Sequence, residues 1–397
     1  MSFIEKHAAL LVGLISPFIR IRKGVALFTS FGGQYNDNPK YVSIKLHEQH
    51  PEYKILWVIS DKARDFPPEY VTVLKYGSVE HFKALYYSQV IVDNHAGSRS
   101  SKYERREWYK MPLYSFLSRH IKKQLCISTW HGTPLKRIAM DEPGARDKYT
   151  FKCSTDYMLS GCSYTEDVLF KSLDKKVTML GLGTPRNDLF FKELDINKLR
   201  RKLGLPVDKK IILYGPTFRD DIERSGKIQI ETLDINRLLI TLNKKFGGNW
   251  CLVFRLHNLV QKAIDVDDLC KRKGDICVIN GNQCDDMAEY LACSDILLND
   301  YSSSMFDFAL SKKPCFIFAP DYDDYSYRER GLYFDIQTLP FPFAITQEQL
   351  FSNIEKFDDN LYFDEIDALL KRLGNYEEGK ASEKVVELID RFIKRRV

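Results

Sequence analysis

The feature that most constrains the fold is a repeated alternation of short apolar runs with segments of helical pattern. Each apolar run has the length of a buried strand, and turn residues separate it from the next helix at the spacing of βαβ units. In the first half we expect strands at 25–28, 55–59, 71–74, 90–93, 125–129, 157–161 and 177–180, and helices at 39–49 (capped by Asn38), 79–88 and 166–172. This order predicts a parallel sheet with helices on both faces.

The alternation restarts after a charged helix at 197–203. We expect strands at 211–214, 250–254, 276–279 and 296–298, helices at 235–246 and 287–292, and a final amphipathic helix at 382–397. The fold class is therefore α/β, with two similar Rossmann-like domains facing each other across a cleft. We place the domains at 1–195 and 205–380, and we expect the helix at 381–397 to pack back on the N-terminal domain.

The stretch Asp295–Pro320 combines a strand, a turn with three serines, a short helix and a second strand. Ser302 or Ser303 stands where the helix Met305–Leu310 should be capped. A strand-to-helix turn of this kind directs free N–H groups and hydroxyl donors at one point, which suits a phosphate. The alternative is that the serines only cap the helix.

Polar side chains gather at four predicted strand ends. They are His131 in the first half and, in the second, Thr217 with Arg219, Arg255 with His257, and Asp300 with Ser302, Ser303 and Ser304. Because such ends line the ligand crevice of open parallel sheets, we expect an enzyme that acts on a phosphorylated substrate. Arginine suits phosphate oxygens, and either histidine could move a proton or support a leaving phosphate.

The sequence lacks the signature motifs of several classes of protein. There is no P-loop, no G-x-G-x-x-G after a strand and no G-x-S-x-G, which argues against a standard NTPase, a dinucleotide oxidoreductase and a serine hydrolase. We assign no metal ligands and no cofactor; Asp321, Asp323 and Asp324 keep a divalent cation open, although an acidic loop explains them as well. The nine cysteines show no C-x-x-C pair, which is typical of reduced cytosolic thiols. A net charge of +5 is too small to indicate nucleic-acid wrapping.

Two segments are candidates for contact with a membrane surface. Ala8–Ile19 is apolar but shorter than the about 20 residues that a membrane span needs, and basic residues follow it. Arg99–Lys123 interleaves basic and aromatic side chains. An ordinary first helix and a solvated helix with a packed stripe are the respective alternatives.

A set of motifs, in order and with suitable spacing, resembles the CDP-glycerol glycerophosphotransferases of teichoic acid synthesis. The motifs are WHGTPLK at 130–136, GLGTPRND at 181–188, YGPTFR at 214–219, FRLH at 254–257, DYSSSMFDF at 300–308 and RGLYFD at 330–335. The resemblance implies a GT-B fold, with an acceptor-binding N-terminal domain and a donor-binding C-terminal domain. It implies transfer of glycerol phosphate from CDP-glycerol to a hydroxyl of an undecaprenyl-diphosphate-linked glycan or polyol-phosphate acceptor, with release of CMP. It also implies peripheral attachment to the cytoplasmic face of a bacterial cell membrane.

The resemblance assigns roles to individual residues. His131 matches the candidate general base, with Gly132, Thr133 and Lys136 on the acceptor side, and His257 matches a second histidine near the donor pyrophosphate. Thr217, Arg219 and Arg255 fall on the donor side, with Asp300 and Ser302–Ser304 in the donor-phosphate turn. Asn258 departs from the family's usual proline after this histidine, so that loop could be set differently.

Three alternatives stay open at this point. The donor could be CDP-ribitol, the chain could be a GT-B glycosyltransferase that uses a sugar nucleotide, or it could be a membrane-associated binding protein with a degenerate site. The motifs do not separate a primase from a polymerase, nor teichoic acid from capsule synthesis.

Overall fold

The computed structural model describes residues 12, 15–95, 101–104, 124–145, 149–152, 155–173, 177–217, 233–256, 277–322 and 331–395. The chain divides into two compact units. Unit 1 comprises Met1–His131, Ile138–Phe191 and Asn375–Val397, and unit 2 comprises Gly132–Arg137 and Lys192–Gly374. The segment after His131 thus clusters with unit 2, and the C-terminal segment clusters with unit 1.

Unit 1 is built on a seven-stranded sheet of order β3-β2-β1-β4-β6-β8-β9, in which each neighbouring pair is parallel. Its strands are β1 (Arg22–Phe28), β2 (Lys54–Ile59), β3 (Thr72–Lys75), β4 (Ser88–Asp93), β6 (Leu125–Ser128), β8 (Tyr157–Leu159) and β9 (Thr178–Leu180). Its helices include α2 (Asp37–Gln49), α3 (Val79–Tyr87), α6 (Ser163–Ser172) and α16 (Ala381–Arg395). An antiparallel pair, β5 (Ser101–Glu104) and β7 (Tyr149–Lys152), accompanies the sheet and was not predicted.

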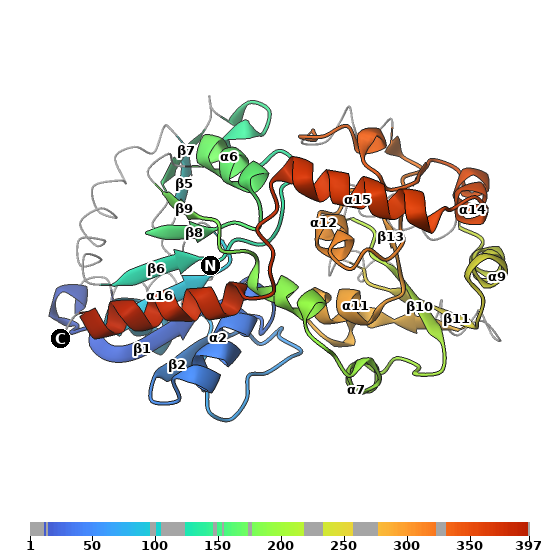
Figure 1. Cartoon of the computed structure of the whole chain (residues 1–397). Coiled ribbons are helices and arrows are strands. Elements are labelled where there is room, and N and C mark those ends of the chain that lie inside the picture. Colours follow the sequence, from blue (N-terminus) through green and yellow to red (C-terminus); the bar gives the residue numbers. More distant parts are fainter. Residues whose placement is uncertain are drawn as a thin grey trace. The chain divides into compact units, whose positions relative to one another are not determined.

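The two faces of this sheet follow directly from the period of two in the strands. Ala26 and Phe28 point to the face that α2 and α16 cover, whereas Val25 and Leu27 point to the other face, toward Ala84 of α3. Figure 1 shows α2 and α16 side by side on the first face. The apolar stripe of α16 is buried there through Val385, Val386, Ile389 and Ile393.

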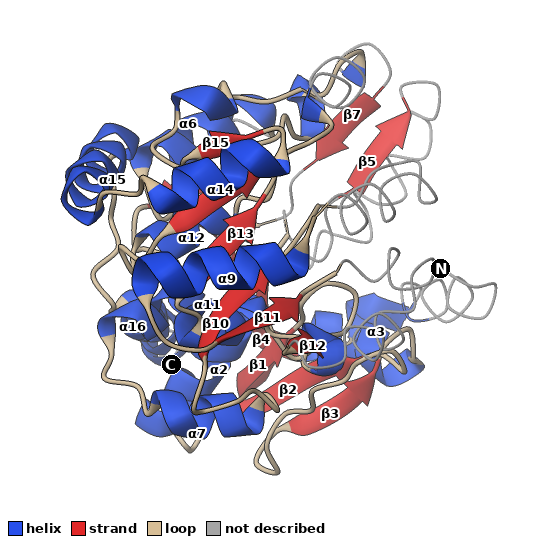
Figure 2. Ribbon diagram, turned by 90° about the vertical axis from the view of Figure 1, so that its right-hand side faces the viewer, coloured by secondary structure: helices blue, strands red, loops and turns tan. Residues whose placement is uncertain are grey.

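Unit 2 repeats this architecture with a six-stranded parallel sheet of order β12-β11-β10-β13-β14-β15. Its strands are β10 (Lys210–Tyr214), β11 (Trp250–Phe254), β12 (Val278–Asn280), β13 (Ile296–Asn299), β14 (Cys315–Phe318) and β15 (Phe343–Ala344). Its helices include α7 (Ile196–Lys202), α9 (Ile235–Phe246), α11 (Met287–Cys293), α12 (Ser304–Ala309), α14 (Gln347–Glu355) and α15 (Asp359–Leu373). Figure 2 shows α9 and α14 lying against one face of this sheet.

In both sheets the first strand of the unit lies in the interior of the sheet and not at an edge. In each unit the first strand has the second on one side and the fourth on the other, so the strand order reverses beside β1 in unit 1 and beside β10 in unit 2. Such a reversal opens a crevice at the carboxyl ends of the strands, where open α/β sheets bind ligands. The two predicted Rossmann-like domains are confirmed, and the site must be sought after β1, β4, β10 and β13.

Two local predictions need correction, and three further elements were missed. Asn38 does not cap α2: Asn36 is at the N-cap position and the helix begins at Asp37. Ser303 is at the N-cap of α12, but its side chain makes no capping hydrogen bond. The segments α14, α15 and β15 were not predicted, because their apolar runs are too short or too interrupted to stand out.

Candidate active site

The candidate site of unit 1 lies after three neighbouring strands. Loops that follow β1, β4 and β6 carry Phe31, Asn94 and His131 respectively, and the pairing β1·β4·β6 puts these loops at one edge of the sheet. Ser30 and Asn94 follow the two strands that flank the reversal of strand order. The predicted position of His131 at a strand end therefore coincides with the crevice that the topology opens.

Asp37 is the anion at the centre of this region. Its carboxylate is 5% exposed and accepts hydrogen bonds from the backbone N–H of Asn38 (2.7 Å), from Nη1 of Arg186 (2.6 Å) and from Nδ2 of Asn94 (2.8 Å). Arg186 belongs to the GLGTPRND segment, in the 3₁₀ helix Pro185–Phe191, and its side chain is itself 12% exposed. A buried carboxylate needs this number of donors, because an uncompensated charge in the interior is costly.

The hydrogen bonds of Asn94 fix the protonation of its neighbours. Its Nδ2 donates to Asp37 and to Oγ of Ser30, so its Oδ1 must be the atom that accepts from the N–H of Phe31 and meets Nδ1 of His95 at 2.9 Å. Its backbone carbonyl accepts from Nδ1 of His131 at 2.7 Å. Because a carbonyl can only accept, His131 carries its hydrogen on Nδ1 when neutral, and Nε2 keeps the lone pair.

The ring of His131 sits among aromatic side chains. Trp130 packs on it with ring centroids 4.1 Å apart, and Phe31 meets it edge-on at 5.7 Å. Desolvation among these groups lowers the pKa of His131 to about 4; the neighbouring His95 ring and the Arg186 cation act in the same direction, and the Asn94 carbonyl and Asp37 oppose it. Because its pKa lies well below 7, the imidazole of His131 is neutral at pH 7. Its Nδ1 is bound to the Asn94 carbonyl, and its Nε2 has no hydrogen-bond partner within the described chain. That is the state required of a general base.

The backbone around His131 is held in unusual conformations. Phe31, Asp37 and Trp130 have φ of 37°, 57° and 52°, in the left-handed region that side chains other than glycine avoid. Asn38 supports one of them: its Nδ2 donates to the carbonyls of Thr129 (3.2 Å) and Trp130 (2.9 Å). Such strain persists only where surrounding contacts over-determine it, and it clusters at functional sites.

The candidate site of unit 2 lies after β10 and β13, on both sides of its own reversal of strand order. Asp300, fully buried, accepts from the backbone N–H of Thr217 through both carboxylate oxygens, at 2.9 and 2.8 Å. The structure therefore brings Thr217 and Asp300 together, as predicted. Through these two hydrogen bonds Asp300 holds the loop that follows β10.

The serine turn that follows Asp300, residues Ser302–Ser304, contains hydrogen-bond donors that no described residue engages. Oγ of Ser302 and Oγ of Ser304 are 3.0 Å apart, and the carbonyl of Ser302 accepts from Nδ2 of Asn299 at 2.7 Å. Within the described chain, the N–H groups of Ser302 and Ser303 and the hydroxyl of Ser303 have no partner. Helix α12, with six residues, adds little dipole, so an anion placed here would depend on these individual donors.

Arg255 makes contacts that the sequence did not predict. Its Nη1 donates to the carbonyls of Gly281 (2.9 Å) and Cys284, and its guanidinium lies over the ring of Tyr290 at 5.0 Å. One edge of the guanidinium thus holds the loop after β12, and a bidentate phosphate contact would have to use Nη2 and Nε. Burial lowers the pKa of Arg255, which remains an obligate cation.

The other predicted site residues are distributed as follows. His257 and Arg219 lie outside the described residues. Gly132, Thr133 and Lys136 follow His131 in a segment that pairs with the RGLYFD segment: Lys136 bridges to Leu332, and Tyr333 N–H donates to the carbonyl of Leu135 at 2.8 Å. Gly132 has φ of 126°, a conformation that only glycine adopts readily, and this lets the chain turn directly after the histidine.

Three residues of the site were not predicted: Asp37, Asn94 and Arg186 act together through hydrogen bonds. Asn94 stands at a predicted strand end, and Arg186 lies in a motif that the sequence offered, so both carried a signal. Asp37 carried none, because its contacts with residues 57 and 149 positions away exist only in the folded chain.

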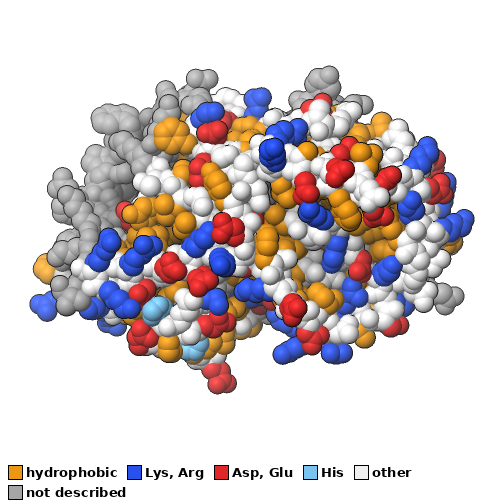
Figure 3. All heavy atoms as spheres, viewed as in Figure 1, with side chains coloured by type: hydrophobic (Ala, Val, Ile, Leu, Met, Phe, Trp, Pro, Cys, Tyr) orange, Lys and Arg blue, Asp and Glu red, His pale blue; other side chains and the backbone are white. Residues whose placement is uncertain are grey.

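Other features of the described residues bear on cofactors and membranes. Among those residues, no group of three or more His, Cys, Asp or Glu side chains could hold a metal ion. Within the same part of the chain, no helix is both long and apolar enough to span a bilayer. On the face drawn in Figure 3, basic and acidic side chains are interspersed.

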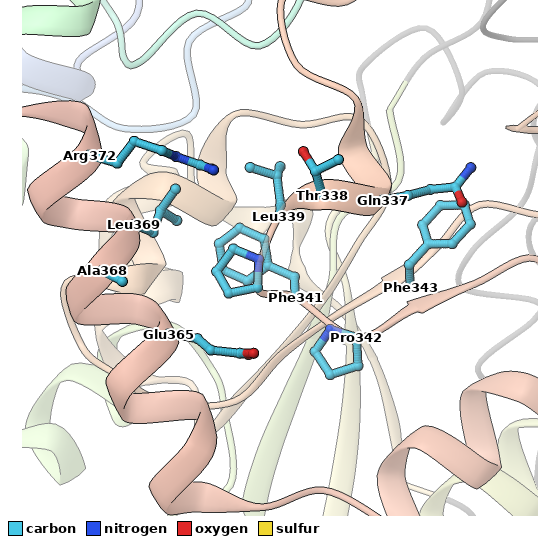
Figure 4. Close-up of a pocket in the computed structure, with 11 residues that line it drawn as sticks. Gln337, Thr338, Leu339, Phe341, Pro342, Phe343, Glu365, Ala368, Leu369 and Arg372 are labelled. Atoms are coloured by element: carbon cyan, nitrogen blue, oxygen red, sulfur yellow. The ribbon is translucent and has the colours of Figure 1, made fainter.

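A hollow of about 550 Å³ lies in unit 2 between segment 337–343 and α15. Phe341 lies at its floor, with Arg372 and Glu365 of α15 along one side (Figure 4). Segment 337–342 leads into the start of β15, whereas Thr217 and Asp300 follow the ends of their strands. The hollow is therefore separate from the strand-end site.

Two parallel-sheet Rossmann-like units, each with polar groups at its reversal of strand order, define an α/β protein of the GT-B class. Residues 12–391 match the family described as CDP-glycerol:poly(glycerophosphate) glycerophosphotransferase, and the chain belongs to this family.

Individual relatives agree with this assignment. The chain is 32% identical over 398 residues to a teichoic acid poly(glycerol phosphate) polymerase of Staphylococcus epidermidis, covering 94% of this chain and 51% of the relative. It is 30% identical over 391 residues to a teichoic acid glycerol-phosphate transferase of Staphylococcus aureus, covering 92% and 93%. The solved structure of the wall teichoic acid polymerase TagF matches with a TM-score of 0.77 and 29% identity, covering 99% of this chain and 95% of that one.

The lengths of the relatives differ. This chain spans about half the length of the polymerases of Staphylococcus epidermidis and Bacillus subtilis, of which 51% and 49% are covered.

Proposed function

We propose that the chain transfers glycerol phosphate from CDP-glycerol to a hydroxyl of a membrane-linked acceptor, with release of CMP, in teichoic acid or capsule-like polymer synthesis. The acceptor is an undecaprenyl-diphosphate-linked glycan or a polyol phosphate. The observation that carries the proposal is the state of His131 in a member of this family: a neutral imidazole whose Nδ1 is engaged by the Asn94 carbonyl and whose Nε2 is available.

The chemistry follows from that state. Nε2 of His131 takes the proton of the acceptor hydroxyl, whose oxygen attacks the β-phosphorus of the donor. The new P–O bond forms as the bond from the β-phosphorus to the bridging oxygen breaks, and that oxygen leaves with CMP. Positioning and electrostatic stabilisation supply most of the rate in phosphoryl transfers.

The donor is assigned to unit 2. The unpartnered N–H groups of Ser302 and Ser303 and the Ser303 hydroxyl are suited to phosphate oxygens, and Asp300 holds Thr217 beside them. Nη2 and Nε of Arg255 are suited to the same group. We assign His257 and Arg219 to the donor pyrophosphate on the family resemblance. His131, with Gly132, Thr133 and Lys136, is assigned to the acceptor.

The acceptor's lipid calls for a membrane surface. We propose peripheral binding to the cytoplasmic face of the bacterial cell membrane. Ile15 and Phe18, 47% and 85% exposed, are apolar side chains of the N-terminal segment that support such contact. Flotation with anionic vesicles tests this proposal, and a chain that stays at the bottom of the gradient with every vesicle composition would contradict it.

CDP-ribitol is the second candidate donor. A teichoic acid poly(ribitol-phosphate) polymerase of Bacillus spizizenii is 32% identical over 220 residues of its alignment with this chain. Glycerol is preferred because relatives named for glycerol phosphate align over most of this chain, 94% in the Staphylococcus epidermidis protein against 53% for the ribitol polymerase.

The test is a product analysis. The chain is incubated with CDP-glycerol or CDP-ribitol and a short lipid-linked acceptor, and CMP and product mass are measured. We expect CMP release that depends on the acceptor and a mass gain of glycerol phosphate units. Release of a nucleoside diphosphate from a sugar nucleotide, with a sugar added to the acceptor, would indicate a glycosyltransferase instead.

A further inference from the structure

The start of helix α2 holds His131 from two sides. Asp37 binds the side chain of Asn94, whose carbonyl receives the Nδ1 hydrogen of His131. The next residue, Asn38, binds the carbonyl of Trp130, directly before His131. Two consecutive residues, at the start of one helix, thus fix both the ring and the backbone of the histidine.

We infer that Asp37 is a positioning residue for the proposed reaction: through Asn94 it holds His131 in the Nδ1–H tautomer, with Nε2 turned to the acceptor hydroxyl. Asp37 does not touch His131, so its effect must pass through Asn94. The inference rests on the proposed role of His131 as the general base.

The direction of the hydrogen bonds requires a carboxylate at position 37. A carboxylate only accepts, so the Asn94 amide must turn its Nδ2 toward Asp37 and its Oδ1 toward the N–H of Phe31 and Nδ1 of His95. Both hydrogens of Nδ2 and the Oδ1 atom are then engaged. This anchors the Asn94 side chain and opposes a turn of its backbone carbonyl away from His131. An asparagine at position 37 could turn its own NH₂ group toward Nδ2 of Asn94. Two donors would then face each other, and the Asn94 amide would no longer be held in one orientation.

Two further observations show that Asp37 is held in place at a cost. Its φ of 57° is unfavourable for aspartate inside the first turn of a helix. Its charge is buried and is compensated by Arg186, whose backbone N–H also donates to Oδ1 of Asn38 at 3.0 Å. A residue that served only to start the helix would need neither feature.

The charged groups around His131 predict how the variant should titrate. Asp37 favours the protonated imidazole, whereas Arg186 and His95 disfavour it. Removing the charge of Asp37 therefore lowers the pKa of His131 further and makes the neutral ring a weaker base. The loss of turnover should thus come from both a mixed tautomer and a weaker base.

The test compares Asp37→Asn with Asp295→Asn. Asp295 also pairs with a buried arginine, Arg200 at 2.8 Å, but in unit 2 and outside the site, so it controls for the loss of an ion pair. The ¹⁵N chemical shifts of the His131 ring report the tautomer without any substrate. We expect Nδ1–H alone in the wild type and in Asp295→Asn, and a mixture of tautomers in Asp37→Asn.

Turnover is measured in the same variants as acceptor-dependent CMP release. Asp37→Asn should lower kcat by about 10–100-fold, the usual effect of losing an orienting partner, and should have no further effect in a His131→Ala background. If Asp37→Asn does not fold, Asn94→Ser, which cuts the same link, carries the test with the same expectations.

Two results would overturn the inference: a pure Nδ1–H tautomer with kcat within about twofold of wild type in the folded variant, or an equal loss in both backgrounds. Failure of the proposed function looks different. In that case His131→Ala keeps its turnover, while the ring shifts still report whether Asp37 sets the tautomer.

Discussion

The two strand-end sites occupy equivalent places in their sheets but are built in opposite ways. Near His131, the carboxylate of Asp37 accepts hydrogen bonds from the side chains of both Asn94 and Arg186, and three residues have positive φ. At the serine turn, Asp300 fixes one loop, but the donors of Ser302 and Ser303 stay without partners in the described chain.

The difference matches the two tasks that we propose. A general base must be held in one tautomer and one orientation before the substrate arrives, and this requires a closed network. A binding turn must keep its donors available, because donors already engaged would have to be released before a phosphate could bind. Changes in unit 1 should therefore reduce kcat, and changes in the serine turn should weaken donor binding.

The largest effect is expected from His131→Ala. Loss of a general base should lower kcat by about 10²–10⁴-fold while the fold is retained. CMP release under saturating donor and acceptor measures it. His47→Ala is the matched control. The ring of His47 stacks on that of Tyr70, with centroids 3.6 Å apart, and neither residue belongs to the site. Near-normal kcat in a folded His131→Ala variant would show that His131 is not the general base.

The serine turn should respond in affinity. Ser303 has φ of −65°, which proline also adopts, so Ser303→Pro removes its N–H and hydroxyl without strain at that residue. Loss of hydrogen bonds to a charged phosphate should raise the Kd for CDP-glycerol by about 10–100-fold. Ser303→Ala keeps the N–H and should cost less. An unchanged Kd in Ser303→Pro, by calorimetry, would place the donor phosphate elsewhere.

Asp300→Asn should act on stability. One of the two oxygens that accept from Thr217 N–H becomes an NH₂ group inside the core, which should lower the free energy of unfolding by about 1–3 kcal/mol. Urea denaturation measures the change. Asp367→Asn is the control, because its ion pair with Lys312 is exposed and should contribute under about 1 kcal/mol. Equal losses in the two variants would mean that Asp300 does not hold the loop.

The smallest expected effect is that of moderate acid on catalysis. Because desolvation lowers the pKa of His131 to about 4, the ring stays neutral as the pH falls from 7 to 5. kcat/KM should therefore hardly change over that range and should decrease only as the pH approaches about 4. The pH profile of kcat/KM is measured with a detergent-solubilised acceptor. A decrease of kcat/KM centred near pH 6.5 would show that His131 is not desolvated.

The sequence predicted most strands and helices of the two sheets because those elements have a local signal of their own. The apolar runs 25–28 and 211–214 became β1 and β10, and their period of two determines which face each side chain covers. What failed was local chemistry that depends on distant partners. Asn38 has the composition of a helix cap, but in the fold its side chain binds the carbonyls of Thr129 and Trp130.

The sequence predicted where the candidate site residues lie better than it predicted which groups they contact. Parallel strand ends pointed to His131, Thr217 and Asp300, and the structure places each at such an edge. The phosphate contact of Arg255 stays a prediction, whereas its bonds to the carbonyls of Gly281 and Cys284 could not be predicted, because only the folded loop brings them to Nη1. Asp37 could not be found in advance, since its partners Asn94 and Arg186 come from distant parts of the chain.

The most direct test of the account separates binding from turnover in one pair of variants. The Kd for CDP-glycerol and the single-turnover rate of CMP release are measured for His131→Ala and Ser303→Pro beside the wild type. We predict that His131→Ala binds the donor as the wild type does and releases CMP at least about 100-fold more slowly, whereas Ser303→Pro binds weakly and recovers most of its rate at saturating donor. If His131→Ala loses donor affinity in proportion to its rate, the division between a fixed base and an open donor turn is contradicted.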